Sequence, residues 1–414
     1  METHFFTQRK LVSLLCVFAL LLTLCVPAAF AEAVFAGGSG TTDDPYQITT
    51  AEQLAAVAEN LSASFILTAD IDLSGEAWTP IGSFVAAADS VTGEDPDPAY
   101  AFTGSFDGNG HAISGLKIDK SFAVVGPYMG TGLFGVVMGT SESSPAEIKN
   151  LTLKNVDVSG FCLVGAAVGL QGGNSLVDNV DLIGSANTIN GCEGVGGIVG
   201  TGADADNYVI QNCDAANVTL TVEPVDLSDY GMAAYPAACA GGVIGGLTGG
   251  EIENCSAENS LIVATGADVY SIGGIVGAPY GTSAISSCDT ENVTIQVDGL
   301  DPTYIGGIAG SAGTYGEAAP AAIRNCHSVN IHLILSDSAA FIGGVVGGGK
   351  EETHNDTSAA LGRFLLTNCS ANGEISGAAA VGAIVGRAEG SEVSNCTADI
   401  TVDGEKYEAQ IGVN

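Results

Sequence analysis

Two short motifs recur along most of this chain and constrain its fold more than any other feature. The first is Ile-x-Asn-Cys, complete at Ile252–Cys255, and the second is Gly-Gly-Ile-Val-Gly, complete at Gly273–Gly277. Variants of the first motif end at Cys213, Cys288, Cys326, Cys369 and Cys396. The copies return after about 27 to 45 residues, a spacing largely within the range of stacked structural repeats. The chain is therefore predicted to be a solenoid rather than a set of separate globular domains.

The residues of each copy favour β-strands. The fullest copy holds three strand-like runs, Ile252 to Ser256, Leu261 to Ala264 and Ser271 to Val276. Val, Ile and Thr are abundant in the repeats, and they suit a pleated, half-buried surface. Three strands and three bends per copy predict one turn, or rung, of an all-β, single-stranded parallel β-helix. About ten rungs spaced by about 4.8 Å would form a rod on the order of 45 Å long.

Each repeated residue has an expected place in such a rung. The glycine pair would permit a bend at the entry to the third strand, and its apolar neighbours, such as Ile272 and Ile275, would form inward columns. The Asn is expected at a corner, where stacked amides can hydrogen-bond along the axis. The six repeat cysteines are expected in one buried file, because Cys is among the most buried residue types.

The start of the chain is expected to be processed. Residues 1–31 have the pattern of a secretory signal, with basic Arg9 and Lys10, an apolar stretch from Leu11 to Val26, and small residues at Ala29 and Ala31. After cleavage of this leader no integral membrane segment is predicted. We therefore expect a secreted or cell-surface protein.

A lead-in and a helix are expected before the solenoid. Residues 32–62 are assigned to them and residues 63–414 to the β-helix. A helix is predicted from Thr50 to Leu61, because its apolar residues recur on one face. Thr50 with Gln53, or Thr49 with Glu52, fits a capping box. The helix would cover the open end of the first rung.

The charge balance limits the partners. The chain has 47 acidic and only 11 basic residues, for a formal net charge of −36. A field of that sign disfavours nucleic acid and anionic membranes and favours cations. No Cys-x-x-Cys occurs, which argues against a zinc site.

Candidate chemistry is sparse, and no catalytic, cofactor-binding or metal-binding residue is assigned. The nearest carboxylate pairs are Asp70 with Asp72 and Asp178 with Asp181, and both are interpreted as parts of an exposed face or a rung corner rather than as catalytic pairs. The basic cluster in the repeats is interpreted as a solvated strand face, and comprises Arg324, His327 and His332. A metal loop is a weaker interpretation than a glycine turn for Asp107, Asn109 and His111.

No cofactor is predicted. Calcium is the one candidate ion, because oxygen-rich acidic loops are suitable ligands for it. The loops in question hold Glu94, Asp95 and Asp97, and Glu351, Glu352 and Asp356. Ligand contacts are expected on the longest insertions, since loops carry function on repetitive scaffolds. These insertions are Phe84 to Ala101, Glu223 to Ala238, Ser311 to Ala322 and Gly348 to Arg363.

The pattern resembles a known family. Gly132-Leu-Phe-Gly135 and the Gly-Gly-Ile-Val-Gly series are similar to the GLUG-type repeats of bacterial surface proteins. The stretch with Asp70-Ile-Asp-Leu73 and Trp78-Thr-Pro-Ile-Gly82 resembles the segment that often precedes such repeats. The resemblance implies an extracellular right-handed β-helix found in adhesin-like proteins and alongside some immunoglobulin-A-cleaving metallopeptidases. It transfers no catalytic residue, since no His-Glu-x-x-His sequence occurs here.

These observations favour an exported, adhesin-like β-helix that acts as a binding or structural module without catalysis. Its expected partners are an extracellular glycan or a host or bacterial surface protein. The alternative is a secreted carbohydrate-active enzyme, a polysaccharide lyase or a glycoside hydrolase, on the same scaffold. The sequence names no ligand, cell anchor or oligomeric state.

Overall fold

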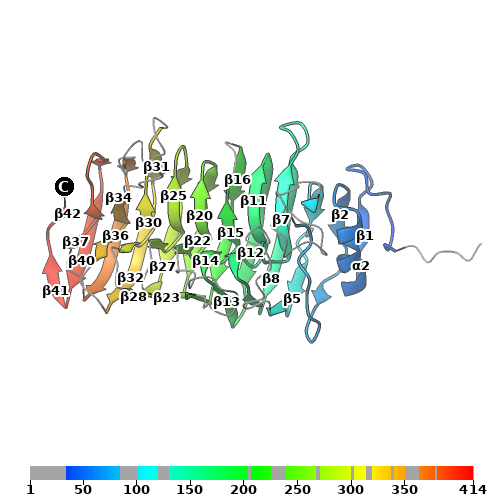
Figure 1. Cartoon of the computed structure of the whole chain (residues 1–414), viewed down its shortest axis with the longest axis horizontal. Helices are drawn as coiled ribbons and strands as arrows, with labels where there is room; N and C mark the ends of the chain where they lie inside the picture. Colours follow the sequence, from blue (N-terminus) through cyan, green and yellow to red (C-terminus); the bar gives the residue numbers. More distant parts are fainter. Residues whose placement is uncertain are drawn as a thin grey trace, which may run out of the picture.

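Parallel strands from successive repeats stack in register along one axis, from the N-terminal to the C-terminal end (Figure 1). In this computed structural model the described residues are 34–83, 100–119, 130–203, 207–224, 239–266, 271–299, 303–313, 319–336, 340–349, 363–377 and 380–413. The Ile of the first motif pairs from copy to copy, Ile210 with Ile252 and Ile252 with Ile285. The predicted parallel β-helix is confirmed. Within the described ranges, no helix has both the length and the apolar character needed to cross a membrane.

The regular rungs contain four or five strands rather than the three that were predicted. The copy around Ile252 forms five: β21 (Glu251–Glu253), β22 (Ser256–Glu258), β23 (Leu261–Gly266), β24 (Ser271–Gly273) and β25 (Val276–Tyr280). The first predicted run is divided at Asn254 and the third at the bend after Gly273. The glycine pair therefore bends the chain between two strands rather than at the entry to one. The prediction of three strands was wrong because short corners do not interrupt the apolar pattern.

The strands form three sheets. The 26-stranded sheet wraps around two sides of the rod. Its first file comprises β1 (Tyr46–Ile48), β2 (Ser64–Leu67), β4 (Ser105–Asp107), β8 (Ala146–Lys154), β12 (Ser175–Ile183), β16 (Tyr208–Gln211), β21, β26 (Ala284–Ser286), β31 (Ala321–Arg324), β35 (Phe364–Thr367) and β39 (Glu392–Ser394). This sheet also contains β3 (Ile71–Asp72), β5 (Ala112–Ser114), β6 (Lys117–Asp119), β9 (Asp157–Ser159), β13 (Asn187–Gly191), β17 (Asp214–Ala216), β18 (Val218–Val222), β22, β23, β27 (Asp289–Glu291), β28 (Thr294–Gly299), β32 (His327–Leu335), β36 (Ser370–Ser376), β40 (Thr397–Val402) and β41 (Glu405–Tyr407).

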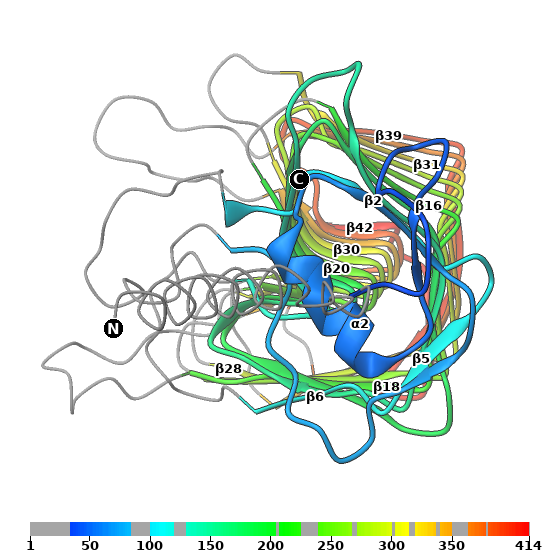
Figure 2. The same cartoon turned by 90° about the vertical axis from the view of Figure 1, so that its right-hand side faces the viewer.

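The two smaller sheets complete the regular rungs. The seven-stranded sheet holds β10 (Cys162–Val164), β14 (Glu193–Gly196), β19 (Cys239–Gly241), β24, β29 (Thr303–Gly306), β33 (Ala340–Gly343) and β37 (Ala380–Gly382). The nine-stranded sheet holds β7 (Phe134–Gly139), β11 (Val168–Gly173), β15 (Val199–Gly202), β20 (Ile244–Thr248), β25, β30 (Ala309–Ala312), β34 (Val346–Gly349), β38 (Val385–Arg387) and β42 (Ile411–Val413). Viewed down the axis, the strands of successive rungs superpose (Figure 2).

Apolar columns fill the interior of the rod. Ile272, Ile305 and Ile342 pair in sequence along the seven-stranded sheet, and all three are fully buried. The residues after the glycine pair form a second buried set, which comprises Ile275, Ile308, Val345 and Ile384. Both predicted inward columns are therefore confirmed.

The repeated Asn lies at a corner in the left-handed region of backbone conformation. Asn254 has a φ of 53°, and its Nδ2 donates to Oδ1 of Asn212 one rung below at 2.8 Å. Asn368 donates to Asn325 in the same way at 3.2 Å. The predicted amide stacking at a corner is confirmed. A second corner, five residues later at Asn259, has the same conformation and accepts a hydrogen bond from Asn292.

The six repeat cysteines form the predicted file. Five are buried and Cys396, in the last rung, is half-buried. Their thiols donate hydrogen bonds to main-chain carbonyls, as Sγ of Cys255 does to Glu253 at 3.3 Å and to Ile210 of the preceding rung at 3.7 Å. The adjacent Cys326 thiol, followed by burial, raises the pKa of the Cys369 thiol to about 12. The file therefore consists of inward-facing thiols, and the pKa is raised for those of Cys255, Cys288, Cys326, Cys369 and Cys396.

A short helix lies across the N-terminal end of the stack (Figure 2). It comprises α2 (Ala51–Ala55) and a 3₁₀ turn, η1 (Ala56–Glu59), and it buries Leu54 and Val57. The hydroxyl of Thr50 accepts a hydrogen bond from the backbone N–H of Gln53, the first of the two predicted capping registers. Strand β1 precedes this helix and pairs with β2, so the lead-in already contributes a strand to the stack. Residues 1–33, including the predicted signal, lie outside the described residues.

Candidate binding groove and polar sites of the first rungs

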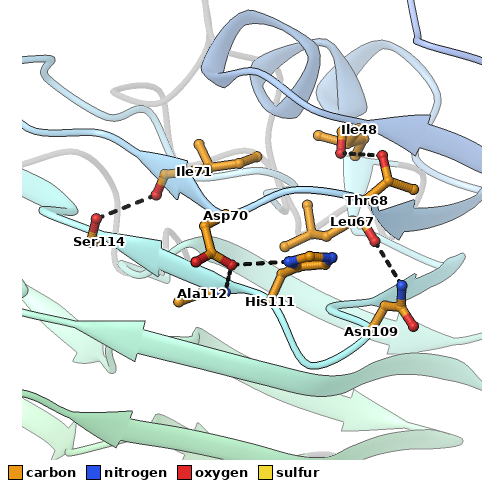
Figure 3. Close-up of polar contacts among 9 residues, drawn as sticks. All are labelled: Ile48, Leu67, Thr68, Asp70, Ile71, Asn109, His111, Ala112 and Ser114. Atoms are coloured by element: carbon orange, nitrogen blue, oxygen red, sulfur yellow. Dashed lines mark hydrogen bonds and ion pairs between the residues drawn. The ribbon is translucent and has the colours of Figure 1, made fainter.

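Two of the predicted candidate residues meet each other across neighbouring rungs (Figure 3). Asp70 precedes β3 and His111 precedes β5, and these strands are parallel neighbours. Oδ1 of Asp70 lies 3.0 Å from Nδ1 of His111 and accepts the backbone N–H of Ala112 at 3.0 Å. The hydrogen bond from Ala112 has the larger effect and that from His111 the smaller, and together they hold the pKa of Asp70 below its usual range. Asp70 therefore joins two rungs as a carboxylate.

The other carboxylates of this region have local structural partners. Oδ1 of Asp72 accepts the backbone N–H of Ser74 at 2.9 Å. The carboxylates of Asp70 and Asp72 therefore bind different partners rather than forming a pair. Asp107 accepts the backbone N–H of Asn109 at 2.7 Å and Nδ2 of Asn150 at 3.0 Å. Asn109 has a φ of 51°, which confirms the predicted turn. Among the described residues, no group of three or more His, Cys, Asp or Glu side chains is arranged to hold a metal ion.

The second carboxylate pair is divided by a corner. Asp178 and Asp181 lie on either side of Asn179, whose φ is 55°. Asp178 accepts Nδ2 of Asn212 at 2.7 Å, and Asp181 accepts the backbone N–H of Asp214 at 3.3 Å. Burial, followed by the nearby charge of Asp214, raises the pKa of Asp181 above its usual range. Both carboxylates thus connect their rung to the next.

The basic cluster lies on one rung, as predicted. Arg324 ends β31 and is exposed, while His327 and His332 lie on β32 with half-buried side chains. Nδ1 of His327 lies 2.8 Å from Oγ of Ser370, and the His327 backbone N–H donates to Asp289 at 3.0 Å. The cluster therefore belongs to an outer strand face, on which His327 forms hydrogen bonds to the neighbouring rungs.

The acidic loops that were considered for calcium lie outside the described residues. This applies to Glu94, Asp95 and Asp97 and to Glu351, Glu352 and Asp356, and to most of the four long insertions.

A polar groove of about 350 Å³ crosses the outer face of the first rungs. Its floor is formed by outward side chains of β2 and β4, among them Ser64, Ile66 and Ser105. One wall is the turn closed by the bridge between Thr41 and Asp44, and the other is the turn closed between Ser141 and Ser144. These turns precede β1 and β8, the strands that flank β2 and β4 in the sheet.

The groove is rich in hydroxyl groups and holds one ion pair. Nζ of Lys149 lies 2.6 Å from Oε2 of Glu147, which also accepts the hydroxyl of Ser105 at 3.2 Å. Apolar contact surface comes from Ile66, Pro45 and Pro145.

Sequence reasoning missed this groove, although a signal was present. Both walls begin with Gly-Thr, at Gly40 and Gly139, and both end with a proline directly before a strand. The shared pattern indicates two similar turns. Only the strand order shows that two rungs separate them and leave a groove between them.

Comparison with known proteins agrees with the repeat pattern. The model of the GLUG motif matches residues 237–262 and 377–403. Halomucin of Haloquadratum walsbyi is 34% identical over 188 residues, which are 44% of this chain and 2% of that protein. A protein of Evansella cellulosilytica, provisionally named a Gly-rich membrane protein, is 36% identical over 160 residues, which are 36% of this chain and 16% of that protein. The chain thus spans a small part of these curated relatives.

A solved structure also aligns with most of the chain. It is a protein of Bacteroides ovatus provisionally assigned as an immunoglobulin A1 protease, with 22% identity and a TM-score of 0.48. The alignment covers 79% of this chain and 84% of that one. The strand register shows a parallel β-helix, and the GLUG-motif model matches two segments of its repeats.

Proposed function

We propose that the protein is an exported, adhesin-like β-helix that acts at the cell surface or in the medium as a binding module without catalysis. The observation that carries this proposal is the polar groove, which is walled by two turns on a rigid stack. Most of the candidate catalytic side chains, by contrast, are hydrogen-bonded within their own rung or to the next one. Export is supported by the pattern of residues 1–31 and by the name of the Evansella relative.

The chemistry of the groove favours a neutral glycan as its ligand. Hydroxyls such as those of Ser64 and Ser144 can exchange hydrogen bonds with sugar hydroxyls, and Pro45 and Pro145 offer apolar contact to sugar rings. An anionic ligand is disfavoured, because Asp107 and Glu147 line the groove and the chain carries a formal net charge of −36.

An extended peptide fits the groove less well. Strand addition needs a free sheet edge, whereas β2 is paired with β1 and β4, and β4 is paired with β2 and β8. A host or bacterial surface protein is therefore the second partner class, and it would have to bind through side chains alone.

The test is binding to a glycan array, followed by titration of the best ligand against two variants. Ser64→Tyr places an aromatic ring on the groove floor, and Thr219→Tyr places one on an exposed strand position outside the groove. We expect the first variant to lose about tenfold or more in affinity, which is about 1.4 kcal/mol, and the control to bind as the wild type does.

Three outcomes would contradict parts of this proposal. Full binding by the Ser64→Tyr variant would place the ligand elsewhere on the surface. Binding to a surface protein but to no glycan would change the partner class. Depolymerisation of a polysaccharide by the purified protein, abolished by Asp70→Asn or Asp178→Asn, would establish the carbohydrate-active enzyme instead.

A further inference from the structure

Two cysteines outside the repeat file form a small buried cluster of their own. Cys162 is 4% exposed and Cys192 is fully buried, and together they make a cluster separate from the main core. Phe161 and Leu163 pack against them. The two thiols belong to neighbouring rungs, since β10 pairs with β14.

The strand register places these cysteines on a diagonal. Cys162 pairs with Glu193, so Cys192 lies opposite Phe161, and its backbone N–H donates to the Phe161 carbonyl at 2.9 Å. A step of about 4.8 Å between rungs and a step of about 3.3 Å along the strand put the two Cα atoms about 5.8 Å apart. Disulfides most often join Cα atoms about 5.5–6 Å apart. The backbone also turns at Leu163, whose φ is 55°, beside Cys162.

The six cysteines of the repeat file have a different geometry. They lie directly above one another in register, so their parallel Cβ atoms stay about 4.8 Å apart, beyond the usual disulfide range of about 3.5–4.5 Å. Bridging two of them would require neighbouring rungs to move closer together.

We propose that Cys162 and Cys192 form a disulfide bond in the exported protein, while the six cysteines of the repeat file remain thiols. The inference rests on the proposed function in one respect: export places the protein in an oxidising compartment, where disulfides persist. The oxidant is a small disulfide such as oxidised glutathione. One cysteine thiolate attacks it and expels one glutathione thiolate, and the second cysteine then displaces the other glutathione. Two protein thiols are oxidised, one small disulfide is reduced, and the released protons go to the two glutathione thiolates.

Burial determines when this exchange takes place. It raises the pKa of Cys162 to about 12 and also raises that of Cys192, so both are protonated in the closed fold at neutral pH. Because the thiolate is the attacking species, the bond forms while these rungs are still open.

The test is refolding of the full chain in an oxidising glutathione buffer, followed by alkylation and peptide mapping of each cysteine. We expect Cys162 and Cys192 to be linked to each other and Cys213, Cys255, Cys288, Cys326, Cys369 and Cys396 to be alkylated. Both cysteines alkylated as free thiols, or a bridge within the repeat file, would overturn the proposal.

A second measurement uses variants and does not depend on mapping. Reductant is expected to lower the melting temperature of the wild type and of the control Cys288→Ser. The double variant Cys162→Ser/Cys192→Ser is expected to melt at the same temperature with and without reductant. An equal response of all three proteins would argue against the bond.

Discussion

At the scale of single residues, polar side chains in this protein mostly connect one rung to the next. Asp70 receives hydrogen bonds from His111 and Ala112 of the following rung, and Asp107 receives one from Asn150. A side chain that binds the neighbouring rung is positioned by the stack. The sequence shows such residues as isolated acids, because their partners lie about 40 residues away.

The Asp70 contact predicts a defined dependence of stability on pH. Its pKa is lowered in the folded state, so the ionised carboxylate stabilises the fold above the usual Asp range near 4. That contribution is lost as the pH falls through the lowered pKa. Asp70→Asn should therefore be less stable than the wild type at pH 7, with a difference that disappears in acid. Urea unfolding midpoints measured from pH 7 downwards provide the test.

Asp399→Asn is the matched control, because Asp399 is an exposed carboxylate on the outer face of β40. Its midpoint should follow that of the wild type across the pH range. A difference between Asp70→Asn and the wild type that persists unchanged at low pH would exclude the carboxylate as the cause.

At the scale of elements, the corners define where each strand ends. Asn is favoured at these corners because it tolerates the left-handed conformation and its amide can bond to the rung below. The same conformation recurs at Asn212, Asn254, Asn325 and Asn368, and Ser287 adopts it in the rung whose motif lacks Asn. Every rung therefore turns at the same point, and that keeps the strands in register.

The corner at Asn254 can be tested with two substitutions that separate strain from hydrogen bonding. Asn254→Ala loses the bond to Asn212 and keeps a side chain in a left-handed conformation, which should cost about 2–3 kcal/mol. Asn254→Gly loses the same bond without the steric cost, and should cost about 1 kcal/mol. Urea unfolding and amide exchange in β21 and β22 measure the difference. Equal effects of the two substitutions would rule out backbone strain at this corner.

At the scale of the whole molecule, charge is the dominant unbalanced feature. The formal net charge of the chain is −36, and acidic side chains within the described ranges lie on outer faces of the rod, as Glu253, Glu258 and Glu291 do. Like charges stacked on neighbouring rungs repel one another. The apolar columns must stabilise the rod against that repulsion.

Salt should therefore stabilise the protein. Raising NaCl from about 0.01 to 0.5 M shortens the Debye length from about 30 Å to less than 10 Å, and the urea midpoint should rise. As a matched comparison, calcium chloride and magnesium chloride are added at equal, millimolar concentrations. An equal rise of the urea midpoint with both salts indicates screening, whereas a larger rise with calcium than with magnesium would establish a specific calcium site. A midpoint that falls with NaCl would contradict the repulsion argument.

The sequence alone determined the class of fold and the place of each repeated residue. Recurrence of one cysteine, one corner Asn and one glycine pair per copy is compatible with in-register stacking, and Cys255, Asn254 and Ile272 are where the repeats placed them. The place of a residue within its rung follows from the repeated pattern of side chains in each copy, which can be recognised in the sequence alone.

Only the tertiary structure decided which residues of different rungs meet. The four or five strands per regular rung, the contact between Asp70 and His111, the groove between two distant turns and the Cys162–Cys192 cluster all depend on register. The copies differ in length by up to about 18 residues, so spacing along the sequence does not give vertical neighbours. Backbone pairing between rungs sets that register, because each strand must align its hydrogen bonds and its inward side chains with those of the rung before it.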